Sequence, residues 1–101
     1  MQYMRPRLLV RTKEIRDDGS IVEIVIWELP EPLAPSKHRF KYRLYFGRPP
    51  RELVRYDNER GKGDHRHLDG EESPYLFTTV EQLLDDFECD VVRRGEYEGN
   101  R

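Results

Sequence analysis

The sequence predicts an α+β domain in which a twisted, mainly antiparallel sheet of four or five strands carries one C-terminal helix packed on one face. Two observations predict this class. Before residue 60 the apolar residues follow the period of two that is typical of strands, and after residue 78 they recur at helical spacing. The chain has 101 residues, which suffice for one domain with a small core. We expect a single domain over residues 1–94 and a disordered tail over 95–101.

The first element is a β-hairpin over residues 7–29. Two runs rich in valine and isoleucine, LLVRTKEI and IVEIVIWEL, flank the turn sequence Asp17-Asp18-Gly19-Ser20. Aspartate and glycine are typical of the short turns that join antiparallel strands. The second run is apolar at odd and even positions alike, which predicts a strand that is central or covered on both faces.

A third strand and its return follow a proline-rich loop. Prolines at positions 30, 32 and 35 cannot donate to a strand ladder, so they predict a loop. From residue 39 apolar and basic residues alternate, which predicts a strand with one core face and one basic face. Residues 47–50 form a turn, and residues 52–58 form the return strand. The expected core residues are Phe40, Tyr42, Leu44 and Phe46, opposite Arg39, Lys41, Arg43 and Tyr45.

The last element is a helix that begins after Thr78 or Thr79. Either threonine can cap the helix, and Glu81 or Gln82 three residues later completes a capping box. The apolar residues then recur at intervals of three and four, which predicts one buried stripe opposite an acidic face. The stripe consists of Val80, Leu83, Leu84, Phe87 and Val91.

The charges are distributed unevenly along the chain although the formal net charge is only −2. Residues 37–63 carry nine basic and three acidic side chains, whereas residues 64–98 carry three basic and eleven acidic ones. A basic segment of this kind is suited to anions such as nucleic acid, unless the acidic segment neutralises it within the molecule. Interleaved tyrosines at 42, 45 and 56 either stack on bases or belong to the core. The candidate nucleic-acid-binding residues are Arg39, Lys41, Arg43, Arg55, Arg60 and Arg66.

Residues 55–67 are richest in groups suited to acid–base chemistry. Two of the three histidines, His65 and His67, lie two residues apart and point to one side of an extended chain. Imidazole changes protonation near neutrality, so such a pair can serve RNA cleavage, taking a proton from the 2′-hydroxyl and returning one to the leaving oxygen. Lys62, Arg55 or Arg60 would stabilise the phosphorane charge. Asp57 or Asp64 would orient a ring.

Two other interpretations of this segment stay open. The histidines and a nearby carboxylate could ligate zinc or manganese, although the spacing is permissive and we expect no metal or other cofactor. Residues 59–72 contain three glycines and hardly any apolar residue, so they could also be a surface loop or irregular strand with solvated charges. The third histidine, His38, lies beyond the proline loop, and we expect it away from the cluster.

Several classes of protein are excluded by composition. No apolar run approaches the length of a membrane span, and the first residues meet charge before a signal-peptide core could form, so we expect a cytoplasmic protein. The single cysteine, Cys89, excludes an internal disulfide and a cysteine zinc cluster.

The order of YRLYF, RYDNERGKGDHRH and TTVEQLLDDF resembles the TumE family of toxin–antitoxin proteins. The resemblance spans residues 7–91, and its most specific part is residues 55–67 with the element His65-Arg66-His67. Some relatives carry a longer histidine cluster where this chain has Lys62 and Asp64. The resemblance implies a small bacterial or archaeal toxin that is encoded beside a DNA-binding antitoxin.

Two functions follow as hypotheses. The first is a toxin that binds or cleaves RNA through the basic face and the histidine segment. The second is a noncatalytic interaction protein that binds a partner subunit, or a second copy in a homodimer, through its acidic helix or a strand edge. Basic charge confined to one face would favour the first, and basic charge dispersed around the domain would favour the second.

Overall fold

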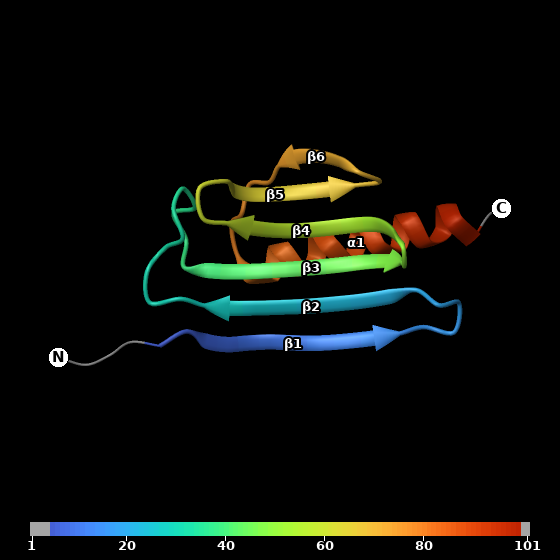
Figure 1. The fold of residues 1–101 in the computed structure, drawn as a ribbon, viewed down its shortest axis with the longest axis horizontal. Helices are drawn as coiled ribbons and strands as arrows, with labels where there is room; N and C mark the ends of the chain where they lie inside the picture. Colours follow the sequence, from blue (N-terminus) through green and yellow to red (C-terminus); the bar gives the residue numbers. More distant parts are fainter. Residues whose placement is uncertain (1–4, 100–101) are drawn as a thin grey trace.

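The fold is a six-stranded antiparallel sheet with one helix, which confirms the predicted α+β class with slightly more strands than the four or five expected (Figure 1). The computed structural model describes residues 5–99, with side chains to residue 95. Each strand pairs with the next one along the chain. The elements are β1 (Arg7–Ile15), β2 (Ile21–Glu28), β3 (Phe40–Arg48), β4 (Arg51–Glu59), β5 (Gly63–Leu68), β6 (Glu71–Pro74) and α1 (Val80–Gly99).

The hairpin of β1 and β2 is confirmed, and Asp18 closes its turn. The Asp18 carboxylate accepts hydrogen bonds from the Ser20 hydroxyl at 2.6 Å and from the Ser20 amide at 2.9 Å. These hydrogen bonds hold the pKa of Asp18 at about 2, below its usual value. The turn thus fixes the register in which Ile15 pairs with Ile21.

Strands β5 and β6 form a regular hairpin, although the sequence predicts a surface loop or an irregular strand over residues 59–72. Asp69 and Gly70, with φ values of 50° and 85°, make the tight turn between them. The apolar pattern is weak because β5 places Asp64 and Arg66, rather than apolar residues, toward the helix. Their hydrogen bonds take the place of apolar burial.

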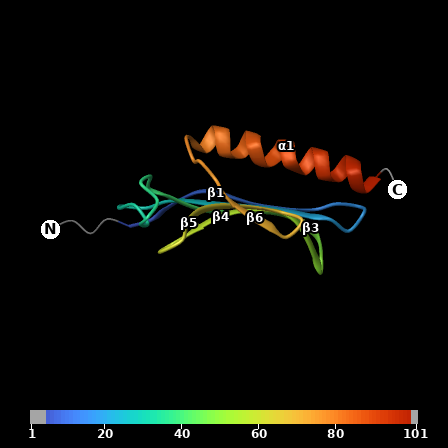
Figure 2. The same ribbon diagram turned by 90° about the horizontal axis from the view of Figure 1, so that it is seen from above.

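Helix α1 covers one face of the sheet and lies nearest to β4 (Figure 2). Among residues 5–99 no element covers the opposite side, which we call the open face. Paired residues share a face, so the register assigns each side chain to one of them. The core beneath the helix consists of Ile26, Tyr42, Leu44, Phe46, Leu53, Val54, Tyr56, Leu83, Phe87 and Val91. The open face carries Arg11, Trp27, Lys41, Arg43, Tyr45, Arg55, Asp57, His65 and His67.

A bulge in β4 alters which residues reach the open face. The pairing shifts between Phe46 and Gly47 of β3, so Leu53 of β4 is left without a partner in the ladder. Leu53 and Val54, although adjacent, are therefore both buried in the core. As a result, Glu52 and Arg55 lie on the same side of the strand although they are three residues apart.

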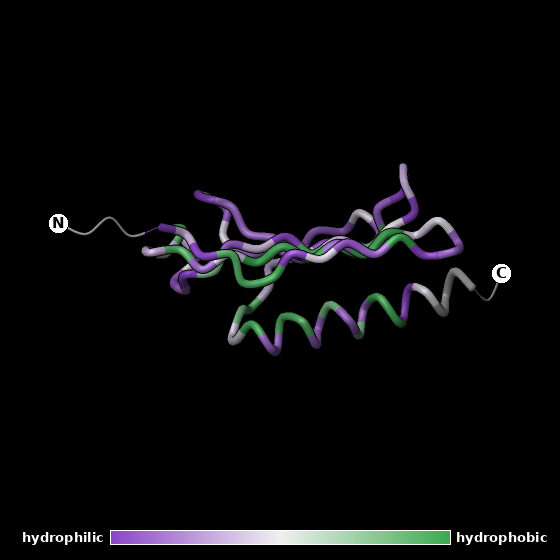
Figure 3. The backbone as a smooth tube through the Cα atoms, turned by 90° about the horizontal axis from the view of Figure 1, so that it is seen from below, coloured by the Kyte–Doolittle hydropathy of each residue, from purple (hydrophilic) through white to green (hydrophobic). Residues whose placement is uncertain are grey.

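Helix α1 is capped by one of the two predicted threonines and buries Leu83, Phe87 and Val91 of the predicted stripe, while Val80 and Leu84 are half-buried. The Thr79 hydroxyl accepts a hydrogen bond from the Gln82 amide at 3.0 Å, which caps the helix. Hydrophobic and hydrophilic stretches alternate along the helix (Figure 3). Leu83 and Phe87 are buried. The disordered tail expected over residues 95–101 stays a prediction, because the side chains after residue 95 and the whole of residues 100–101 lie outside the described part. No helix of the described part combines the length and apolar character of a membrane span.

Candidate functional site

The structure divides the predicted catalytic residues between the two faces of the sheet. Pairing of Arg55 with His67 and of Asp57 with His65 places these side chains together on the open face. Asp64 alternates with His65 along β5 and therefore points to the helix face. The expectation that His65 and His67 share one side is confirmed, and Asp64 is separated from both by the sheet.

His67 belongs to a compact set of charged side chains, the His67 cluster, which consists of Glu52, Arg55, Asp57 and His67. The Arg55 guanidinium lies 2.9 Å from a Glu52 oxygen and donates to Asp57 Oδ2 at 2.5 Å. It also lies 3.5 Å from His67 Nδ1, while His67 Nε2 lies 3.9 Å from Asp57 Oδ1. Because a guanidinium can only donate, Nδ1 acts as the acceptor and the ring proton lies on Nε2, toward Asp57. The side chains of His67 and Asp57 are each 14% exposed.

His65 is held by one hydrogen bond, and its second ring nitrogen is buried without a hydrogen-bond partner among the described residues. Its Nε2 donates to the Lys62 backbone carbonyl at 2.6 Å, and its Nδ1 lies 3.1 Å from Glu72 Oε1. Nε2 is therefore occupied as a donor, and Nδ1 is the ring nitrogen left for a proton transfer. The Lys62 ammonium is exposed and lies 3.9 Å from a Glu59 oxygen.

Asp64 lies in a second set of polar groups on the helix face, the Asp64 cluster, which consists of Ser36, His38, Tyr42 and Asp64. The Asp64 carboxylate accepts hydrogen bonds from the Ser36 hydroxyl, from His38 Nε2 at 2.7 Å and from the Tyr42 hydroxyl at 2.7 Å. His38 Nδ1 accepts from the Phe40 amide, which fixes the proton on Nε2. The expectation that His38 lies apart from the candidate residues is wrong with respect to Asp64, because the proline loop folds back onto β5.

The proline loop, residues 30–36, contacts the β4–β5 turn at two further points, one a hydrogen bond and one a close approach. The Gly61 amide donates to the Ala34 carbonyl at 2.8 Å. Gly63 has a φ of +78°, and a Cβ atom there would lie 3.3 Å from the Pro35 ring. The contacts of Asp64 thus hold the loop in place, and none of its carboxylate oxygens faces His65 or His67.

Arg66 is also used within the molecule. Its guanidinium makes a bidentate ion pair with Asp90 of α1, with N–O distances of 3.0 and 2.8 Å. The Tyr56 hydroxyl donates to the same carboxylate, whose side chain is only 7% exposed. This candidate for nucleic-acid binding therefore joins the helix to the sheet.

We expect three of the six tyrosines to resist ionisation until the protein unfolds. Burial, and then a hydrogen bond to a carboxylate, raise the pKa of Tyr42, Tyr56 and Tyr75 far above the usual value near 10. A raised pKa in the folded state means that the associated stability is present below pH 10 and is lost as the pH rises above it. Absorbance at 295 nm against pH should show two classes of tyrosine. A single transition near pH 10 in folded protein would contradict the burial.

The other basic candidates lie on or beside the open face. Lys41 donates to the Asn58 carbonyl at 3.0 Å, and the Arg43 guanidinium lies 5.3 Å from the centre of the Tyr45 ring. Arg39 precedes β3 and Arg60 follows β4, so the antiparallel pairing brings both to one end of the sheet, where both are exposed. Of the tyrosines considered for stacking, Tyr42 and Tyr56 are buried in the core, and Tyr45 remains on the open face.

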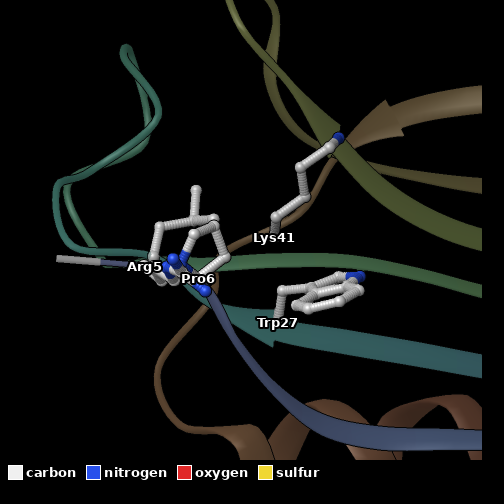
Figure 4. Close-up of a pocket in the computed structure, with 5 residues that line it drawn as sticks. Arg5, Pro6, Trp27 and Lys41 are labelled. Carbon is white, nitrogen blue, oxygen red and sulfur yellow. The ribbon is translucent and has the colours of Figure 1, made fainter. Parts of the chain in front are cut away.

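Trp27 is a residue that the sequence interpretation did not single out. It pairs with Lys41 on the open face and lines a hollow with Arg5, Pro6 and Leu29 (Figure 4). A signal was present, because β2 is apolar on both sides although its outer side has no covering element among the described residues. A tryptophan on such a surface is typical of binding sites.

His65 and His67 do not belong to a group of side chains that could hold a metal ion within the described residues. Within residues 5–99 no group of three histidine, cysteine or acidic side chains lies in an arrangement suited to a metal ion. Nδ1 of His67 lies 3.5 Å from the Arg55 guanidinium, and Nδ1 of His65 is buried 3.1 Å from a single carboxylate oxygen.

Fold and site together define a small α+β domain that presents a His-Asp-Arg cluster, a tryptophan and several cations on an uncovered antiparallel sheet. The family model described as toxin TumE matches residues 2–95, nearly the whole chain. The chain therefore belongs to the TumE toxin family, which confirms the resemblance of the motifs and implies an antitoxin as partner. No curated protein and no solved structure matches the chain.

Proposed function

We propose that this toxin binds RNA along the open face and cleaves it at the His67 cluster. One observation carries the proposal: the strand register gathers side chains from β3, β4 and β5 on a face that no described element covers. These are Lys41 and Arg43, then Arg55 and Asp57, then His65 and His67. Cations, acid–base groups and an open surface are what a phosphodiester substrate requires.

The chemistry would be transesterification within the RNA. The 2′-oxygen attacks phosphorus and forms the new P–O bond, while the bond to the leaving 5′-oxygen breaks. His67 takes the 2′-hydroxyl proton at Nδ1 once the phosphate draws Arg55 away, and Arg55 then stabilises the added negative charge. His65, as the doubly protonated imidazolium, gives its Nδ1 proton to the 5′-oxygen after Glu72, which is half-exposed, moves aside, and Nε2 keeps its proton on the Lys62 carbonyl. Alternate residues of a strand lie roughly 6.5 Å apart, which lets the two rings flank one phosphate.

In the cell we propose that the toxin is restrained by a DNA-binding antitoxin and acts in the cytoplasm, where its RNA substrate is found. The exposed edge of β1 would also permit pairing with a second copy, since no other strand within residues 5–99 pairs with its outer side.

A noncatalytic interaction protein remains the second candidate, favoured by a specific observation. Basic side chains are not confined to one face, because Arg66 pairs with Asp90 on the helix face and Arg48 pairs with Asp18 at a distant turn. Helix α1 also exposes several carboxylates to a partner, namely Glu81, Asp85 and Glu88. This function would need neither histidine.

We expect RNA affinity to fall steeply with salt, because each phosphate that the protein neutralises releases condensed counterions. Replacing Lys41 and Arg43 by alanine should reduce the slope of log affinity against log salt by about two, one for each cation. The measurement is fluorescence anisotropy of labelled RNA between low and high salt. Arg48→Ala is the matched control, since Arg48 lies at the β3–β4 turn. Salt-independent binding, or no binding at low salt, would favour the second candidate.

A further inference from the structure

The hollow beside Trp27 combines an apolar floor with a cationic rim. Trp27, Pro6 and Leu29 supply the apolar surface, and Arg5 and Lys41 supply the charges. In Figure 4 Arg5 and Pro6 lie on one side of the hollow, with Trp27 and Lys41 on the other. These two features are complementary to a nucleotide, because a base presents a flat apolar face and its phosphate carries a negative charge.

The hollow continues along the open face toward more cations. A neighbouring depression shares Trp27 and Lys41 and adds Arg11, Val25 and Arg43, together with Tyr42 and with Glu23, whose carboxylate lies 3.5 Å from the Arg43 guanidinium. The Arg11 guanidinium lies 5.9 Å from the centre of the indole ring. The Lys41 ammonium donates to the Asn58 carbonyl of β4 at 3.0 Å, so the side chain extends from the rim of the hollow toward β4 (Figure 4).

We propose that this hollow binds an unpaired nucleobase of RNA, stacked on Trp27, while Lys41 and Arg43 contact the phosphates of the same strand. Stacking on an aromatic side chain requires a base that has left a duplex, so the site selects single-stranded RNA and tolerates different sequences. The inference rests on the proposed function, because it takes RNA as the ligand of the open face.

The stacking site is separate from the His67 cluster. Along β3, Lys41 lies four residues before Tyr45, which is roughly 13 Å of extended chain. Tyr45 pairs with Arg55, and Arg55 pairs with His67. The hollow therefore binds RNA beside the cleavage position and contributes to affinity and substrate choice, not to the chemical step.

Trp27 is the only tryptophan of the chain, so its emission reports directly on the hollow. The probe is a single-stranded 2′-O-methyl oligonucleotide, which lacks the free 2′-hydroxyl and is not cleaved. We expect its addition to the full-length protein to quench Trp27 emission in a saturable way. The same sequence as a blunt duplex should leave the emission unchanged.

Variants separate stacking from a general effect on the fold. Trp27→Leu should weaken binding of the labelled oligonucleotide about tenfold, whereas Trp27→Phe should retain most of the affinity. An oligonucleotide without a base at the stacked position should bind wild type and Trp27→Leu equally. Leu76→Ala is the control, because Leu76 is apolar, 84% exposed and outside the hollow.

The outcomes distinguish this inference from the function on which it rests. If RNA is bound and cleaved while Trp27 emission stays constant and Trp27→Leu binds like wild type, the stacking site is overturned and the proposed function stands. If the protein binds no RNA at low salt, both are overturned. Quenching that follows protein concentration without RNA would assign the hollow to a second copy of the chain and would also overturn the proposal.

Discussion

Phe87→Ala is expected to lower the free energy of unfolding by about 3–5 kcal/mol, a large share of the stability of a domain of this size. Phe87 is 2% exposed at the middle of the helix stripe, and its ring meets the Tyr56 ring edge-on with centroids 6.0 Å apart. Its removal leaves a cavity between α1 and the sheet, since the strands cannot collapse into it. Denaturant melts of the two proteins measure the difference.

Leu84→Ala should cost less, about 1–2 kcal/mol, although both residues belong to the predicted stripe. Leu84 is only half-buried, because it faces the groove between α1 and the β1–β2 hairpin, which the helix does not fill. Val92→Ala is the control on the same helix, since Val92 is 52% exposed, and its effect should stay within about 0.5 kcal/mol. Equal losses for Phe87→Ala and Val92→Ala would contradict the placement of the helix.

The elements that the sequence could predict are those whose burial is apolar. The β1–β2 hairpin, β3 and α1 all carry valine, isoleucine, leucine or phenylalanine at the period of their structure, because each packs an apolar face against the core. Strand β5 could not be predicted in this way, since Asp64 and Arg66 are half-buried through hydrogen bonds and an ion pair. The Asp69-Gly70 turn was the one local signal for its hairpin with β6.

The candidate site was predictable in part. Alternation along β5 sufficed to place His65 and His67 on one side of that strand. Alternation along β3 likewise placed Lys41 and Arg43 on its outer side. The partners of Asp64 were not predictable, because they depend on how the loop from residue 30 to 36 folds back over the sheet. The bulge at Leu53, which brings Glu52 to Arg55, likewise leaves no mark in the apolar pattern.

We expect His67→Ala to reduce RNA cleavage at least about a hundredfold and to abolish growth arrest when the protein is expressed without its antitoxin, because acid–base groups contribute this much or more to such reactions. His67→Gln should be as inactive, although its amide can still hydrogen-bond Arg55 or Asp57, since an amide does not take up a proton near neutrality. Both variants should bind RNA with nearly the wild-type affinity. Cleavage is measured with purified protein and labelled RNA, and thermal melts report the folding of each variant.

The histidines supply matched controls that separate chemistry from folding. His38→Ala should lower the melting temperature, because it removes a hydrogen bond from the half-buried Asp64 and the stacking on Phe77 at 3.8 Å, yet the folded fraction should still cleave. His67 is 14% exposed within β5, so its own replacement by alanine should cost some stability, and His67→Gln less.

Cleavage should survive EDTA if His67 acts as a base, whereas EDTA would abolish a metal-dependent reaction. If His67→Gln still cleaves RNA, or if wild-type protein leaves growth unaffected in a host that lacks the antitoxin, the catalytic role of His67 is refuted and the interaction protein becomes the better account.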